Sequence, residues 1–301
     1  MTTSSAVLTP RPAQIDNDVL LHGIKARRST RTFDGAPLQA EHLEVIRGYL
    51  DDPECMRGPL GGEFRIELLT GVDEHKEIGT YGYTKGFQTV LVAIARPEPL
   101  VLFEMAHVLH GLVLYLAHLG VGTVWMGAAF NPADILQATR VMSDEIIAAI
   151  IPLGYAGDKK RLIDYAAPLV LKAAKRKPMD EVFYFGDFGT PLGDHGGPFH
   201  AALDLARRAP SAKNKQSWRA VVSRDHTRIH LYAAFGLRHQ VGTGRKKYAC
   251  PPEYLDVGTF HRSLEVALMA DGLEGTLVVE EPDVRIPDGA DIEYLATWVR
   301  R

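Results

Sequence analysis

The spacing of apolar residues predicts a series of helices and strands in the first half of the chain. Periodic apolar positions predict helices over residues 18–28 and 40–50, and alternating or β-branched runs predict strands over 63–71 and 89–97. A long apolar run over 101–127 then predicts a buried helix that leads into a strand at 123–126. An amphipathic helix is expected at 131–141. The run from Ile146 suits a strand or a helix end, and we favour a strand because β-branched residues cluster before Pro152.

The second half of the chain repeats this outline. It predicts a helix at 202–210, strands at 218–225 and 228–234, and a long apolar helix that passes through glycine into a strand over 255–281. Gly122-Thr123 aligns with Gly275-Thr276, and Phe64 falls opposite Trp218 at nearly the same offset. A helix–glycine–strand junction alone is common, but a constant offset across two elements favours a duplicated α+β unit.

These patterns predict four segments. Residues 1–15, rich in small polar residues and proline, are expected to form a disordered arm. Residues 16–184 form the first half, the Gly/Pro/Asp-rich residues 185–199 a linker, and residues 200–301 the second half, with both halves in one compact unit. The apolar run over 101–127 is long enough to span a membrane, but Glu104, His107 and His110 interrupt it, so a buried core helix is favoured.

Composition excludes several classes of protein. The hydrophobic fraction of 46% and the charged fraction of 24% are typical of a soluble globular protein. A formal net charge of -3 gives no global positive field to attract nucleic acid or an anionic membrane. Cys55 and Cys250 lie far apart, without the spacing of a disulfide framework or a structural zinc site, which fits a reducing cytoplasm.

Two short segments carry candidate chemistry. Residues 27–31, RRSTR, place three guanidinium groups and two hydroxyls together, which suits a phosphate, although a solvated basic helix end would look the same. Residues 209–219, APSAKNKQSWR, place hydroxyl and amide groups on a loop between a helix and a strand, where an ordinary turn is the alternative. Glu104, His107 and His110 share one helix face, but no second ligand motif accompanies them, so no metal site is predicted.

Taken together, these motifs resemble the nitroreductase family, in particular its single-chain group with two fused nitroreductase-like halves. The resemblance runs from about Ile24 to Gly275. It rests on several motifs in order: RRSTRTF, TYGYTKG, LGVGTVWMGAAFN, IPLGYAGDKKR, KRKPMDEVFYFGDFGTPL, APSAKNKQSWR and YLDVGTFHRSLEVAL. It implies an α+β nitroreductase-like fold, a pseudo-dimer of duplicated halves whose mixed, largely antiparallel sheets surround long central buried helices.

The resemblance also implies an FMN site at the junction of the two halves. Arg27 and Ser29 would bind the phosphate with Arg28 nearby and Arg176 in support, and Arg31 would reach the pyrimidine edge of the flavin. The remaining predicted contacts are backbone groups of Trp125, Met126, Gly127 and Ala128, and the loop residues Pro210, Ser211, Asn214 and Gln216. Ser217 stands where the family has proline, and neither motif recurs in the opposite half, so we expect one FMN site per chain.

The implied activity is hydride transfer from NAD(P)H to FMN and then to a small acceptor such as a nitro compound or a quinone, in a ping-pong reaction. No side-chain acid or base is assigned. The alternatives are a flavin-binding sensor or storage protein without turnover, and a protein that binds a different anion at RRSTR. The expected partners are small molecules, with no nucleic acid or membrane. The fused pseudo-dimer makes a monomer plausible, and a homodimer is possible.

Overall fold

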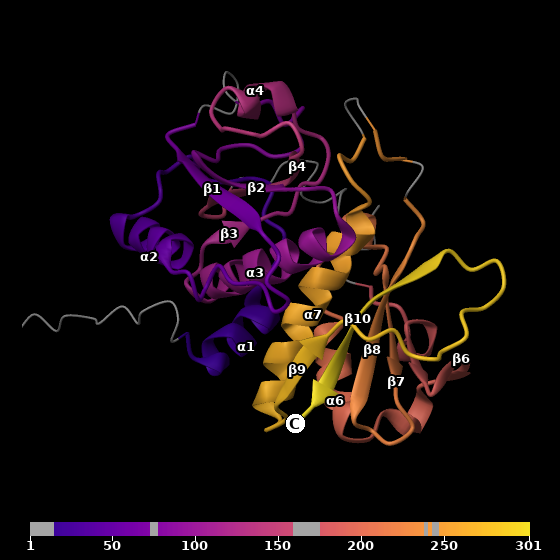
Figure 1. Ribbon diagram of the computed structural model, residues 1–301. Helices are drawn as coiled ribbons and strands as arrows, with labels where there is room; N and C mark the ends of the chain where they lie inside the picture. Colours follow the sequence, from indigo (N-terminus) through magenta and orange to yellow (C-terminus); the bar gives the residue numbers. More distant parts are fainter. Residues whose placement is uncertain (1–14, 73–77, 159–174, 238–239, 243–246) are drawn as a thin grey trace, which may run out of the picture.

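The fold consists of two mostly antiparallel sheets on either side of two long central helices (Figure 1). This computed structural model describes residues 15–72, 78–158, 175–237, 240–242 and 247–301. The predicted N-terminal arm lies outside these residues apart from Ile15. The first sheet (indigo to magenta) is built from residues 64–154, and the second sheet (salmon to yellow) from residues 183–300, so it begins before residue 200 (Figure 1).

The first half contains a four-stranded sheet in the order β1-β2-β4-β3, with every pair antiparallel. Its central strand β2 is buried along its whole length, as its β-branched sequence predicts. The elements are α1 (Asn17–Ala26), α2 (Ala40–Asp51), β1 (Phe64–Thr70), β2 (Thr89–Ala95), α3 (Pro99–His118), β3 (Gly122–Thr123), α4 (Pro132–Leu136) and β4 (Ile146–Gly154).

The second half contains a six-stranded sheet in the order β6-β5-β7-β8-β10-β9. Only β5 and β7 pair in parallel. The elements are η2 (Met179–Glu181), β5 (Phe183–Phe185), β6 (Asp187–Pro191), η3 (Gly193–Phe199), α6 (His200–Ala206), η4 (Ala212–Asn214), β7 (Trp218–Val222), β8 (Arg228–Ala234), α7 (Pro252–Ala270), β9 (Gly275–Val278) and β10 (Ile292–Arg300).

The two sheets share a topology, which confirms the duplicated α+β architecture. The order β1-β2-β4-β3 in the first half matches β7-β8-β10-β9 in the second. β1 and β7 begin at Phe64 and Trp218, and β3 and β9 begin at Gly122 and Gly275, the pairs that the sequence offset aligned. In each half, a long helix precedes the short edge strand.

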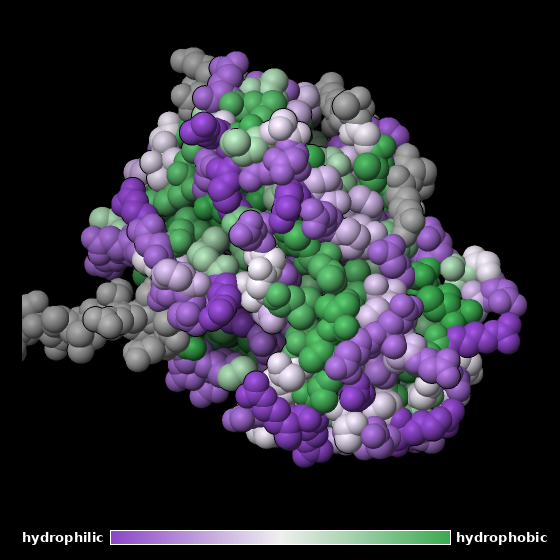
Figure 2. Space-filling model, viewed as in Figure 1, coloured by the Kyte–Doolittle hydropathy of each residue, from purple (hydrophilic) through white to green (hydrophobic). Residues whose placement is uncertain are grey.

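The long helices α3 and α7 pack against each other at the centre of the molecule (Figure 1). Gly258 allows the close approach, because a Cβ there would lie 2.2 Å from the carbonyl oxygen of Phe103. By length and composition α3 could cross a membrane, but 89% of its most apolar window is buried inside the protein. The apolar run that forms α3 is therefore a core helix, as predicted. On the face shown in Figure 2, apolar surface gathers in the region of α7.

Three segments differ in detail from the sequence prediction. The strand predicted at 123–126 ends at Thr123, and Met126 rejoins the sheet only through an isolated bridge to Ile150. The helix predicted at 131–141 ends at Leu136, where the N–H and hydroxyl of Thr139 both donate to the carbonyl of Ile135. Residues 185–199, predicted as a linker, contain β6 and η3. Their glycines serve as turn positions, such as Gly186 with φ 72° between β5 and β6.

Candidate functional site

A cavity of ≈ 530 Å³ lies between the two halves. Eight predicted site residues line it: Ser29, Arg31, Trp125, Met126, Gly127, Ala128, Pro210 and Ser211. Its other lining residues, which the sequence prediction missed, are Tyr83, Val124, Ala129, Ala149, Ala212, Lys213, Tyr248, Pro252, Leu255, Asp256 and Thr259. All of these except Ala149, Tyr248 and Pro252 fall within motifs that carried the family resemblance, so those motifs were the signal available in the sequence.

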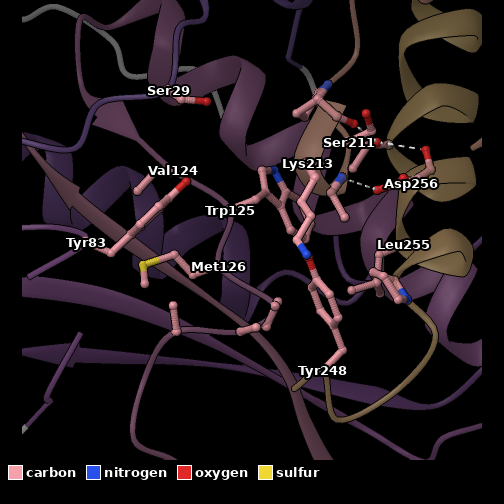
Figure 3. A pocket seen from close by; sticks show the side chains of 18 of the residues that line it. Ser29, Tyr83, Val124, Trp125, Met126, Ser211, Lys213, Tyr248, Leu255 and Asp256 are labelled. Carbon is pink, nitrogen blue, oxygen red and sulfur yellow. Dashed lines mark hydrogen bonds between the residues drawn. The ribbon is translucent and has the colours of Figure 1, made fainter. Parts of the chain in front are cut away.

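Figure 3 shows how the two halves face each other across this space. Tyr83, Val124 and Met126 stand on the first-half side, and Ser211, Leu255 and Asp256 stand on the second-half side, with Trp125 between them. Trp125 Nε1 is buried and has no hydrogen-bond partner among the described residues. A buried indole N–H without an acceptor is costly, so this donor favours a polar atom of a ligand.

The segment after β3 presents backbone donors to the cavity. The N–H and C=O of Met126 are both used in hydrogen bonds to Ile150, each 2.9 Å long. The N–H groups of Gly127 and Ala128 donate to no atom in the described part of the chain. Gly127 also makes room for Tyr248, because a Cβ there would lie 3.1 Å from the Tyr248 ring. Gly127 and Ala128 can therefore donate to a ligand, whereas Met126 contributes its side chain.

Guanidinium groups gather beside this cavity. Arg27 is half-buried at the end of α1, and burial, followed by the nearby charges of Arg176, Arg28 and Arg31, lowers its pKa to about 10. Burial and then the charges of Arg207, Arg208 and Arg28 also lower the pKa of Arg176. We call Arg27, Arg28 and Arg176 the guanidinium cluster. Within the described ranges, neither Arg27 nor Arg28 forms an ion pair with a carboxylate, so the cluster suits an anion.

Arg31 supplies a cation inside the cavity. Its side chain is only 7% exposed, and its guanidinium carbon lies 5.4 Å from the centre of the Tyr83 ring. A buried cation at a cavity wall stabilises negative charge on a bound ligand more strongly than an exposed one. Arg31 therefore differs from the guanidinium cluster in being buried and in lining the cavity itself.

The predicted loop residues divide into two groups. Pro210 and Ser211 line the cavity, whereas Asn214 and Gln216 do not. Asn214 Nδ2 donates to the carbonyl of Lys175 at 3.0 Å, and Gln216 Oε1 accepts from the N–H of Lys177 at 2.9 Å. The sequence thus placed Asn214 and Gln216 on the loop that lines the cavity, but their side chains contact the segment that carries Arg176.

Asp256 fixes the loop from the side of α7. Its Oδ1 accepts from the N–H of Ala212 at 2.8 Å. Burial raises its pKa to about 8, with the neighbouring Glu253 adding to the effect and hydrogen bonds from Ala212 and Ser217 opposing it. Glu104 on α3 holds the corresponding loop of the first half, accepting from the N–H groups of Leu60 at 2.5 Å and Gly62 at 2.8 Å.

On α3, His107 and His110 are used in packing against α7, whereas Glu104 contacts the loop before β1. All three side chains are at most 4% exposed. His107 Nδ1 lies 2.9 Å from His261 Nδ1, and His110 Nε2 lies 3.2 Å from Ser263 Oγ. They are core residues, as the sequence prediction favoured. The described residues contain no group of three or more side chains of the metal-binding types placed to hold an ion.

Comparison with known proteins gives the family. Residues 19–252 match the family model described as "Putative TM nitroreductase". A structure described as a putative nitroreductase from Thermotoga maritima is 15% identical, with a TM-score of 0.54 over 93% of each chain. A nitroreductase family protein from Clostridium novyi is 23% identical over 48% of this chain and 90% of its own, with a TM-score of 0.38.

A nitroreductase with bound FMN from Bacteroides fragilis is 16% identical over 48% of this chain and 91% of its own, with a TM-score of 0.36. No curated protein matches the chain. The family model covers most of the sequence, and the Thermotoga structure shares the fold from end to end. The chain therefore belongs to this nitroreductase family.

Proposed function

We propose that the protein is an FMN-dependent NAD(P)H oxidoreductase that reduces a small acceptor such as a nitro compound or a quinone. The observation that carries the proposal is the cavity between the halves, which has an apolar, aromatic wall and the cation Arg31, with the guanidinium cluster close to Arg31 outside the lining. A flavin nucleotide has the matching parts, a large planar ring and a phosphate dianion.

The residues present fit this cofactor. The guanidinium cluster with Ser29 would bind the phosphate, and Trp125, with the N–H groups of Gly127 and Ala128, would contact the ring. Arg31 would stand at the ring edge where negative charge develops. Pro210 and Ser211 would close the site from the second half, so both halves are needed to complete it.

When bound, the flavin would accept hydride from reduced nicotinamide and pass the electrons to the acceptor. The protein supplies position and charge. Arg31 would stabilise negative charge on the ring, and the apolar, aromatic wall would pack against it. Donor and acceptor would use one open face in turn, which gives ping-pong kinetics.

The proposed partners of the protein are small molecules. We propose a nicotinamide donor and a small acceptor, with no nucleic acid or membrane partner, and a cytoplasmic location. Because one chain holds both halves of the site, a monomer is sufficient for activity, and a homodimer is compatible with it.

The test is the purified full-length protein with its bound small molecule identified by mass and visible spectrum. The expected result is oxidised FMN that is bleached under anaerobic conditions by NADH or NADPH and restored by a quinone or a nitroaromatic compound. A colourless protein that does not take up added FMN would refute the proposal. Bound FMN that neither nicotinamide bleaches would instead indicate a flavin-binding protein without turnover.

A further inference from the structure

The loop over residues 211–217 has an unusual backbone. Lys213, Asn214 and Gln216 have φ values of 50°, 55° and 51°, although none of them is glycine. Such conformations persist only where surrounding contacts fix them. Ser211 Oγ accepts from the N–H of Gln216 at 2.9 Å, which closes the loop on itself. The contacts of the loop with the rest of the protein should therefore explain its shape.

The main contacts of Asn214 and Gln216 are with residues 175–177. Asn214 Nδ2 donates to the carbonyl of Lys175, and Gln216 Oε1 accepts from the N–H of Lys177. Gln216 is 3% exposed, and its Nε2 donates to the backbone carbonyl of Asn214 at 3.2 Å, which ties the Gln216 side chain to the Asn214 backbone. The loop thus holds this segment at both of its ends.

Between these two contacts lies Arg176. Its Nη1 donates to Asn214 Oδ1 at 3.3 Å, and its Nη2 donates to the carbonyl of Arg208 at 3.0 Å. Its Nη1 also donates to the carbonyl of Lys175 at 3.3 Å, and together these oxygens orient the guanidinium. Arg28 and Arg208 lie close enough to lower the pKa of Arg176 further, which places its charge within the guanidinium cluster.

We propose that Asn214 and Gln216 are positioning residues, which act on the flavin nucleotide through Arg176 by holding that guanidinium against the phosphate. This inference rests on the proposed function, because it requires the guanidinium cluster to bind the phosphate of FMN. It differs from the contact with flavin that the family resemblance implied for the two residues.

The two roles predict different ligand selectivity. A side chain that contacts the ring or the ribityl chain contributes equally to the binding of FMN and of riboflavin, which lacks the phosphate. A side chain that acts through Arg176 contributes only to the binding of FMN. The ratio of the two affinities therefore separates a positioning role from direct contact.

The experiment measures dissociation constants for FMN and riboflavin on the flavin-free full-length protein by quenching of flavin fluorescence. The variants are Arg176→Ala, Asn214→Gly, Gln216→Met and the double variant Arg176→Ala/Asn214→Gly. Glycine is chosen at position 214 because it retains the positive φ. His226→Gly is the matched control, since His226 also has a positive φ but lies in the turn between β7 and β8 and does not line the cavity.

The expected result is a loss of FMN affinity of roughly tenfold or more for Arg176→Ala, the magnitude of a charge-assisted contact. Asn214→Gly and Gln216→Met lose part or all of the same factor, and riboflavin affinity stays within about twofold of wild type in every variant. The double variant binds FMN as Arg176→Ala does, because Asn214 acts through a group that is already absent. His226→Gly retains both affinities.

This inference alone would be overturned if Asn214→Gly and Gln216→Met lost affinity for FMN and for riboflavin equally while the wild type still preferred FMN. Additive losses in the double variant would also overturn it. Wild-type protein that binds neither flavin would overturn the proposed function, and the positioning role with it. Thermal unfolding of each variant identifies misfolded protein, and because the two single variants alter different contacts, either one suffices for the test.

Discussion

At the scale of single residues, Arg31 is the cation most directly placed to affect flavin chemistry. It is buried at the cavity wall beside Tyr83. Arg31→Met should lower the reduction potential of bound FMN, because negative charge gained on reduction loses a charge-assisted contact. A contact of about 1.5–3 kcal/mol corresponds to roughly 30–60 mV for a two-electron couple. Anaerobic titration against a reference dye measures the shift. Arg31→Lys should retain most of the potential, and an unchanged potential in Arg31→Met would contradict the assignment.

Asp256 predicts a pH-dependent stability. Its pKa is raised to about 8 in the folded protein, so between pH 4 and pH 8 the unfolded chain loses this proton while the folded protein keeps it. Ionisation therefore favours unfolding, and stability contributed by this group falls as the pH rises through that window. Asn at this position still accepts from Ala212 but cannot ionise.

Asp256→Asn should consequently raise the unfolding midpoint of the flavin-free protein more at pH 8 than at pH 5, which thermal unfolding at the two pH values measures. Glu104→Gln is the matched control in the first half, where the carboxylate holds Leu60 and Gly62. A midpoint lowered at pH 8 in Asp256→Asn would show that the charge itself is needed there.

At the scale of elements, the interface of α3 and α7 carries buried neutral histidines. Burial lowers the pKa of His261 to about 4 and those of His107 and His110 well below 6.5, with nearby charged groups as smaller causes. Below pH 6.5 the unfolded chain therefore binds protons that the folded protein excludes, and stability falls as the pH drops from about 6.5 toward 4.

His110→Gln should reduce this pH dependence, because one fewer proton is taken up on unfolding. Urea unfolding at several pH values gives the slope. His200→Gln, a change of an exposed histidine on α6, should leave the slope unaltered. Equal slopes in wild type and His110→Gln would mean that His110 is protonated within the folded interface.

The elements also show which features the sequence could predict. Strong periodicity located α1, α2, β2 and both long helices within a few residues, since packing and propensity agree there. The strand predicted at 123–126 stopped early because Val124 and Trp125 line the cavity instead of continuing the sheet. Local pattern could not place Tyr248 in the site either, as its position depends on a tertiary contact with Gly127. For the same reason, local pattern could not predict the contacts of Asn214 with residues 175–177.

At the scale of the whole molecule, duplication gives two equivalent loops, of which one lines the cavity between the halves. The loop before β1 and the loop before β7 are each held by a carboxylate of a long helix, Glu104 or Asp256. Only the second loop lines the cavity between the halves, whereas residues of the segment 54–57 near the first loop line a separate cavity of ≈ 300 Å³. In the first loop, the N–H groups of Leu60 and Gly62 donate to Glu104 and are therefore not available to a ligand.

This asymmetry predicts one FMN per chain. Native mass spectrometry of the reconstituted protein gives the ratio directly, and the flavin released on denaturation gives it independently. Arg27→Ala should reduce the occupancy of that single site, so that at limiting FMN the bound fraction falls toward zero. If a second site existed in the first half, the variant would instead retain one FMN per chain. A wild-type ratio of two would contradict the prediction, and would mean that the loop held by Glu104 opens to bind a second cofactor.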